Sequence, residues 1–277
     1  APPRALTEDE IVALIQRFAR SAGIVKRAGF SGVQIHAAHG YLISQFLSPL
    51  TNQRSDQWGG SAENRRRFVL EVYRAMRAEV GAAFPIGIKL NSADFQQGGF
   101  SEGESLAVIQ ALHDEGIDLV ELSGGTYEAP AMSDQKRHRA STLAREAYFL
   151  EFAEKVRAAV PVPLMVTGGF RSLGGMATAL SSGAMDLIGL ARGLAIEPDL
   201  PQRLLAGHEP QYAVRPISTG IKAIDRMALM EVVWYSRQLR RMAKGQAPKP
   251  NESGLWSFCA NLLHNGVGTW KTRRLRA

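Results

Sequence analysis

The sequence predicts an α/β fold with parallel strands, and three observations support this. Short apolar runs of strand length alternate with stretches of helical periodicity along most of the 277 residues. Strands separated by helices pair in parallel through right-handed crossovers. Polar or glycine residues follow the apolar runs, which is typical of active residues in a TIM (β/α)8 barrel. A doubly wound sheet is the alternative, but the Gly-x-Gly-x-x-Gly fingerprint after its first strand is missing.

Helix start signals separate the expected strands. Thr7 and Glu10 form a capping box, Ser101 and Glu104 form another, and Ser61 is expected to cap a helix between them. Further helices are expected at residues 147–159, after Ser172 and beyond Pro198. The expected strands are residues 32–36, 86–90, 119–122, 163–167 and 187–190. Residues 37–60 are expected to be one long loop, a length that usually indicates function.

An irregular polar string follows the first expected strand. It begins with His36, His39 and Tyr41, where the apolar run ends, and continues to Arg65. In letters it reads QIHAAHGYL, SQFLSP, NQRSD, GGS and NR. This string resembles the Old Yellow Enzyme family of flavin-dependent ene-reductases, within the wider NADH:flavin oxidoreductase group. The resemblance implies a TIM barrel with FMN as cofactor and NAD(P)H as co-substrate.

The resemblance assigns the five strands to positions four to eight of the barrel. The first three βα units would then be absent, on the order of 100 residues at roughly 30 residues per unit. We therefore expect residues 1–207 to form a partial TIM barrel that binds FMN and substrate. Residues 208–277 are expected to form a C-terminal helix, with apolar residues spaced from Ile221 to Leu239, and an extended tail.

His36 and His39 are predicted to be catalytic and substrate-binding residues. Their neutral imidazole N–H groups would donate hydrogen bonds to a substrate carbonyl oxygen, so that the β-carbon of the adjacent C=C bond accepts hydride from reduced flavin. The same donors would bind phenolates. Tyr41 is expected to be the general acid, because a tyrosine with a pKa of about 10 is protonated at neutral pH. No metal site is expected, since no nearby Cys or Glu completes a zinc set.

Two turns suit a phosphate group. Gly168 and Gly169 follow the fourth expected strand, and Ala191 and Arg192 follow the fifth. Glycines let backbone N–H groups approach an anion, a helix N-terminus adds a favourable dipole, and barrels commonly bind phosphate with their last two loops. The resemblance implies that both turns hold the phosphate of FMN, with Arg192 close to the flavin.

Lys89 lies inside an apolar strand, between Ile88 and Leu90. A lysine that points into a barrel core is costly unless an anion or a dipole compensates its charge. The resemblance places a cation, often arginine, beside N1 and the C2 carbonyl of the anionic reduced flavin. We therefore expect Lys89 to contact FMN.

Other polar residues receive weaker assignments. The rest of the polar string is expected to brace the loop through Asn52, Arg54, Asp56, Asn64 and Arg65. Four residues could line the mouth of the barrel, although no motif fixes their roles: Asp94, Ser123, Tyr127 and His138.

Composition bounds the partners and the compartment. The net charge of +7 comes with basic runs that suit solvated helix faces, so nucleic acid is not an expected partner. No apolar run approaches ~18 residues, so no membrane span is expected. The N-terminus lacks the apolar region of a signal peptide, and the single Cys259, interpreted as structural, excludes an internal disulfide. A cytoplasmic location is expected.

The sequence thus predicts an FMN-dependent NAD(P)H oxidoreductase that reduces the C=C bond of α,β-unsaturated carbonyl compounds. Its partner would be a small-molecule enone, and a homo-oligomer is left open. One cysteine cannot ligate the iron–sulfur cluster of the dienoyl-CoA reductase branch. Two alternatives stay open. One is a non-redox lyase or isomerase acting on a phosphorylated substrate, with Lys89 as a Schiff-base residue. The other is an inactive barrel fragment with a binding role.

Overall fold

The computed structural model describes residues 4–125, 149–212, 215–227 and 229–274. The chain divides into two compact units, Ala1–Gly189 and Leu190–Ala277, and each unit is described by itself. The division falls earlier than the expected boundary at residue 207. The reason is that Ile196, which follows the last strand, packs in a hydrophobic cluster with Ile217 and Trp234 of the second unit.

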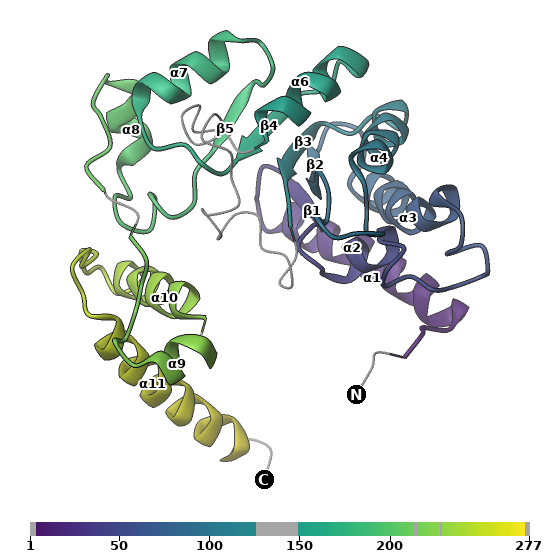
Figure 1. Cartoon of the computed structure of the whole chain (residues 1–277). Helices are drawn as coiled ribbons and strands as arrows, with labels where there is room; N and C mark the ends of the chain where they lie inside the picture. Colours follow the sequence, from purple (N-terminus) through teal and green to yellow (C-terminus); the bar gives the residue numbers. More distant parts are fainter. Residues whose placement is uncertain (1–3, 126–148, 213–214, 228, 275–277) are drawn as a thin grey trace. The chain divides into compact units, whose positions relative to one another are not determined.

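A parallel sheet of five strands forms the centre of the first unit (Figure 1). The strands are β1 (Val33–Ala37), β2 (Ile86–Asn91), β3 (Leu119–Ser123), β4 (Leu164–Thr167) and β5 (Leu187–Gly189). Each strand pairs with the next one along the chain. A doubly wound sheet would reverse its strand order, whereas neighbouring strands of a barrel follow one another. The parallel α/β class is therefore confirmed, and closure by further strands stays a prediction.

Helices flank and connect the strands of the first unit, and three of their caps, Thr7, Ser61 and Ser101, were predicted correctly. They are α1 (Glu8–Arg27), α2 (Leu42–Leu47), α3 (Ala62–Val80), α4 (Glu102–Asp114), α6 (Leu150–Ala159) and α7 (Leu173–Ser181). Both capping boxes form, at Thr7 with Glu10 and at Ser101 with Glu104. The Ser61 hydroxyl accepts a hydrogen bond from the backbone N–H of Asn64 at 3.1 Å. These caps satisfy N–H groups that a helix start leaves without partners.

The expected loop at residues 37–60 was wrong in one respect, because it contains the short helix α2. Ile43, Phe46 and Leu47 of this helix are buried, and the Phe46 ring stacks on Phe68 of α3 with centroids 4.2 Å apart. Tertiary packing therefore stabilises a helix that is too short to form alone.

The two faces of the sheet differ in polarity. Side chains alternate between the faces along each strand, and paired residues of neighbouring parallel strands share a face. One set, which we call the apolar face, is at most 1% exposed and comprises Ile35, Ile86, Ile88, Leu90, Val120, Leu122, Leu164 and Val166. The other set, which we call the polar face, comprises Gln34, His36, Lys89, Asn91, Glu121, Ser123 and Thr167. The polar face is where the sheet carries groups capable of chemistry.

The second unit is helical. It contains α8 (Leu200–Leu205), α9 (Lys222–Met227), α10 (Met230–Met242) and α11 (Gly254–Arg274). Its core is built on Trp234, which is 1% exposed and whose indole N–H donates to the carbonyl oxygen of Glu252 at 2.9 Å. Cys259, interpreted as structural, is exposed on α11.

Two expectations for the C-terminal region were wrong. Residues 221–239 form parts of two helices, α9 and α10, where one was expected. The supposed extended tail is largely the helix α11, because its prolines, Pro248 and Pro250, precede Gly254, where the helix begins. Gly254 itself lies too close to the Ser218 carbonyl oxygen to admit a Cβ atom. Within the described residues, no helix combines the length and apolarity needed to cross a membrane.

Candidate active site

Three predicted residues meet at the carboxyl end of β1. The rings of His36 and His39 lie with centroids 5.5 Å apart in an edge-on arrangement. The Tyr41 ring lies 4.8 Å from the His36 ring and is 45% exposed. The structure therefore brings two imidazoles and a phenol group together on one accessible spot, as the sequence predicted.

A left-handed turn places the His39 ring. His39 and Gly40 both have positive φ, at 61° and 79°. Such a conformation is uncommon for a residue other than glycine and costs about 1–3 kcal/mol, so surrounding contacts must impose it. The backbone N–H of His39 donates to Asn91 Oδ1 at 3.2 Å, and that of Gly40 donates to Ser44 Oγ at 3.2 Å.

Asn91 connects this turn to the rest of the strand ends. It is 1% exposed at the end of β2, and its Nδ2 group donates to the carbonyl oxygen of Gly125 at 3.0 Å. The Ser105 hydroxyl of α4 donates to the Asn91 carbonyl oxygen at 2.8 Å. A buried amide with this many partners is a rigid support for the histidine turn.

Both imidazoles are neutral at neutral pH. Burial lowers the pKa of His39 to about 4, and the positive charges of Lys89 and His36 contribute further. Burial and then Lys89 also lower the pKa of His36. His39 Nε2 lies 2.7 Å from the Ser123 hydroxyl of β3, which holds the ring in place. A neutral imidazole still carries one N–H group that can donate to an uncharged or anionic oxygen.

A buried carboxylate occupies the middle of the polar face. Glu121 on β3 is 5% exposed and accepts hydrogen bonds from three other strands. The donors are Lys89 Nζ at 2.5 Å, Thr167 Oγ1 at 2.6 Å and Gln34 Nε2 at 2.8 Å. Burial alone would raise the pKa of Glu121, but the hydrogen bonds from Lys89, Thr167 and Gln34 outweigh it and lower the pKa. Glu121 is thus an ionised partner of Lys89.

This pairing corrects the sequence argument about Lys89. The side chain lies on the polar face, with 20% of it exposed. However, its charge is compensated by Glu121 within the chain, so the cost of burial does not by itself require a ligand anion. Glu121 was missed although a signal existed, since it is a charged residue in the middle of an otherwise apolar strand.

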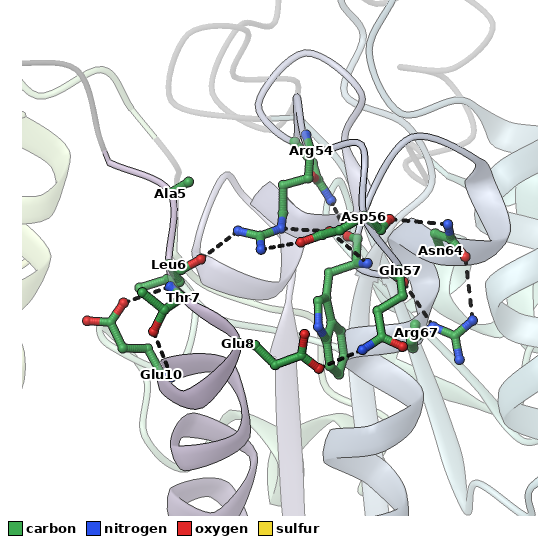
Figure 2. A network of polar contacts seen from close by, with 12 residues as sticks. Ala5, Leu6, Thr7, Glu8, Glu10, Arg54, Asp56, Gln57, Asn64 and Arg67 are labelled. Atoms are coloured by element: carbon green, nitrogen blue, oxygen red, sulfur yellow. Dashed lines mark hydrogen bonds and ion pairs between the residues drawn. The ribbon is translucent and has the colours of Figure 1, made fainter.

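The polar string after Tyr41 braces the loop, as expected. Figure 2 shows Arg54 between the Asp56 carboxylate, at 2.5 Å, and the Leu6 carbonyl oxygen, at 2.7 Å. Asn52 donates to two backbone carbonyl oxygens of the same loop, at 2.7 and 2.8 Å. Arg65 donates to the Leu47 and Gly60 carbonyl oxygens and to the Glu104 carboxylate.

Asn64 completes this bracing, since its Nδ2 group donates to the Asp56 carbonyl oxygen at 3.3 Å.

The four residues that were expected near the mouth of the barrel without a fixed role divide into two pairs. Ser123 contacts His39, and Asp94 is 2% exposed, where it accepts the backbone N–H of Phe100 at 3.0 Å. Tyr127 and His138 lie outside the described residues.

The predicted phosphate turns are divided between the units. Gly168 and Gly169 follow β4 with φ of 117° and 98°, values that a residue with a side chain rarely adopts. The next helix, α7, begins just after them with Ser172 as its cap. Ala191 and Arg192 belong to the second unit, where Arg192 lies 3.5 Å from the Glu231 carboxylate. Their shared role in phosphate binding stays a prediction.

Among the residues that the structure describes, no group of three or more His, Cys, Asp or Glu could hold a metal ion.

Sequential parallel strands with a polar carboxyl edge define a protein of the parallel α/β class. Residues 1–211 match the NADH:flavin oxidoreductase / NADH oxidase family. The NADH-dependent flavin oxidoreductase iccE of Talaromyces variabilis is 41% identical over 260 residues, which cover 87% of this chain and 62% of the relative. The NADH-dependent flavin oxidoreductase nadA of Aspergillus parasiticus is 44% identical over 211 residues, covering 76% and 47%.

Solved structures agree with these relatives. Morphinone reductase matches with a TM-score of 0.61 and 29% identity, covering 78% of this chain and 53% of that one. The old yellow enzyme homologue of Zymomonas mobilis matches with a TM-score of 0.61 and 27% identity, covering 76% and 56%. The chain belongs to the NADH:flavin oxidoreductase / NADH oxidase family. It spans less than two thirds of the length of each relative named here.

Membership of this family confirms the prediction of FMN as cofactor, and NAD(P)H as the reductant of the whole protein stays a prediction. The residues that the structure describes fit an FMN cofactor. The polar face carries the side chains of Gln34 and Lys89, which can donate hydrogen bonds, and the Gly168–Gly169 turn has no Cβ atoms to keep an anion from the backbone. These features suit the two ends of a flavin mononucleotide, its ring and its phosphate.

Proposed function

We propose that this chain is part of an FMN-dependent NAD(P)H oxidoreductase that reduces the C=C bond of α,β-unsaturated carbonyl compounds. The observation that carries the proposal is the cluster of His36, His39 and Tyr41 at the end of β1. Family membership supports the flavin-dependent part of the proposal. The cluster supports the ene-reductase part, because it offers two neutral donors and one proton source at the same spot.

Each residue of the cluster has a distinct role in this proposal. The imidazoles of His36 and His39 donate hydrogen bonds to the carbonyl oxygen and stabilise the negative charge that develops on it. Tyr41, whose ring is accessible, delivers a proton to the α-carbon. FMN, when bound, supplies the two electrons of the reduction.

The cofactor contacts are assigned for each unit by itself. In the first unit, Lys89 would face the flavin ring from the polar face, and Gly168 and Gly169 would hold the phosphate through their backbone amides. In the second unit, Ala191 and Arg192 stay candidates for a phosphate contact on the ground of the sequence. Morphinone reductase has been solved in complex with tetrahydroNAD, which supports a site that a nicotinamide can enter. The 2-naphthoyl-CoA reductase complex, with a TM-score of 0.69 and 30% identity, supports a conjugated carbonyl compound as substrate.

The non-redox alternative is disfavoured by the pairing of Lys89. A Schiff-base mechanism needs a free amine, whereas Lys89 is held at 2.5 Å by the Glu121 carboxylate. The inactive-fragment alternative makes a different prediction, namely that no purified form reduces an enone.

A visible spectrum combined with turnover tests the proposal. The purified holoprotein should show flavin absorption bands, should oxidise NADH or NADPH catalytically under anaerobic conditions only when cyclohexenone is present, and should release cyclohexanone. A Tyr41→Phe variant should keep the flavin bands and bind the enone, but should release the saturated product more slowly. Absence of flavin bands, or flavin reduction without cyclohexanone formation, would contradict the proposal.

A further inference from the structure

Glu121 has no role in the function proposed above, although its carboxylate accepts three hydrogen bonds from other side chains of the polar face. One of its carboxylate oxygens accepts both Lys89 Nζ and Thr167 Oγ1, and the other accepts Gln34 Nε2. A buried carboxylate is expensive unless such partners compensate it, and an apolar residue would suit a barrel interior better. The cost of burying this carboxylate indicates that the charge of Glu121 has a function in the candidate site.

The sheet is arranged to admit this network. Gln34 on β1 pairs with Gly87 on β2, which has no side chain, and Gln34 Nε2 reaches the Glu121 carboxylate on β3 at 2.8 Å. At the other side, Gly189 on β5 pairs with Thr167 on β4, and a Cβ atom at Gly189 would lie 1.8 Å from Thr167 Oγ1. The glycine at position 189 therefore leaves the space that the Thr167 hydroxyl group occupies beside Glu121.

We infer that Glu121 is a positioning residue, the resident counter-ion of Lys89, and that it sets how much positive charge the polar face presents to bound FMN and to the histidine pair. The inference rests on the proposed function, because it assumes that FMN lies against this face. Lys89 stands beside His36 in the strand register and Glu121 stands beside Lys89. The two opposite charges are thus fixed side by side next to the site.

The histidines already respond to both charges. Lys89 lowers the pKa of His36 and of His39, whereas Glu121 raises both. The charges therefore act in opposite directions on the same rings. On a flavin bound to the same face, the charges of Lys89 and Glu121 would likewise have opposite effects, since Coulomb interactions act on any nearby charge. Without Glu121, Lys89 would be an uncompensated cation that favours an anionic, reduced flavin.

The first test measures the pKa values of the histidine rings and needs no flavin. Imidazole NMR titrations should show lower pKa values for His36 and His39 in Glu121→Gln, and higher values in Lys89→Met. Glu115→Gln is the matched control. This substitution also removes an ion pair, the one with Arg74, but Glu115 lies outside the polar face. Unchanged or raised histidine pKa values in Glu121→Gln would overturn the inference.

The second test measures the two-electron midpoint potential of the FMN bound in the holoprotein. Glu121→Gln should raise the potential, Lys89→Met should lower it, and the double variant should return toward the parent value. A purely structural role predicts instead that the double variant departs furthest from the parent. If flavin binds and the Glu121→Gln potential does not rise, the inference fails while the proposed function stands. If no form binds FMN, the proposed function fails, and the histidine titration still decides whether Glu121 is the counter-ion.

Discussion

At the scale of single residues, His39 shows why this strand end suits carbonyl recognition. Its ring nitrogen is held by Ser123 at 2.7 Å, and its backbone N–H is held by Asn91 at 3.2 Å. Burial keeps the ring neutral. A donor that is fixed in advance loses little entropy when a ligand binds, which improves both affinity and transition-state stabilisation.

The histidine pair should dominate the binding of phenols. We expect His36→Ala or His39→Ala to weaken phenol binding to the holoprotein by about 1–3 kcal/mol, the range for a lost hydrogen bond in a buried site. Flavin reduction by NAD(P)H should suffer less than enone reduction. Spectral titration with a phenol measures the affinity, and His208→Ala, on an exposed position, is the control. Parent-like phenol affinity in both histidine variants would remove the pair from the site.

The low pKa of His39 predicts a pH dependence of stability. The folded protein keeps this ring neutral down to about pH 4, whereas an unfolded chain protonates it near the ordinary value of about 6.5. The contribution of His39 to the free energy of unfolding is therefore complete above pH ~6.5 and is lost as the pH falls toward 4. Imidazole NMR should show the His39 ring neutral at pH 5. A His39 resonance that titrates near pH 6.5 would show that its burial does not control its charge.

At the scale of elements, turns at the carboxyl ends of the strands adopt conformations that favour glycine. The His39–Gly40 turn follows β1, and the Gly168–Gly169 turn follows β4. Helices of ordinary geometry lie beyond both turns, at α2 and α7. Strained or glycine-dependent backbone thus occurs at the edge of the sheet where the candidate site lies, as it does at many functional sites.

The Gly168–Gly169 turn gives the prediction at this scale. We expect Gly168→Ala or Gly169→Ala to weaken FMN binding to the holoprotein and to cost about 1–3 kcal/mol of stability, because alanine is strained at φ of 117° or 98°. Gly174→Ala is the control, since Gly174 lies in α7 with open space around it. Flavin fluorescence measures the affinity, and urea unfolding measures the stability. Tight FMN binding by both turn variants would contradict a phosphate site here.

At the scale of the whole molecule, the sheet has two outer strands. Within the described residues, β1 and β5 each pair with one neighbour only, and the polar face lies open enough for His36 and Leu187 to be exposed. Unpaired parallel edges and exposed apolar surface favour aggregation.

We therefore expect a polypeptide of residues 1–277 on its own to fold poorly and to retain little FMN. Supplying the three βα units that the resemblance places before this region, in the same chain or as a second chain, should restore solubility and the yellow colour of bound flavin. Size-exclusion chromatography with absorbance detection measures both properties. A cooperatively unfolding, flavin-saturated monomer of residues 1–277 would show that the sheet needs no further strands.

Much of the fold could be predicted because its signals are local. Caps at Thr7, Ser61 and Ser101 depend on residues three positions apart, and strands are read from short apolar runs. The helices α2 and α11 could not be predicted. The first is stabilised by Phe46 packing on Phe68, and the second begins where Gly254 fits against Ser218, contacts between residues distant in sequence.

For the candidate site, the sequence by itself determined which residues lie at the strand ends, including His36, His39 and Tyr41, because strand order follows chain order in this sheet. Only the tertiary structure decided the charge balance behind them. Lys89 and Glu121 come from separate strands, and nothing local to either residue shows that their side chains meet. Their pairing depends on the register of the two strands, which is set by packing across the whole sheet.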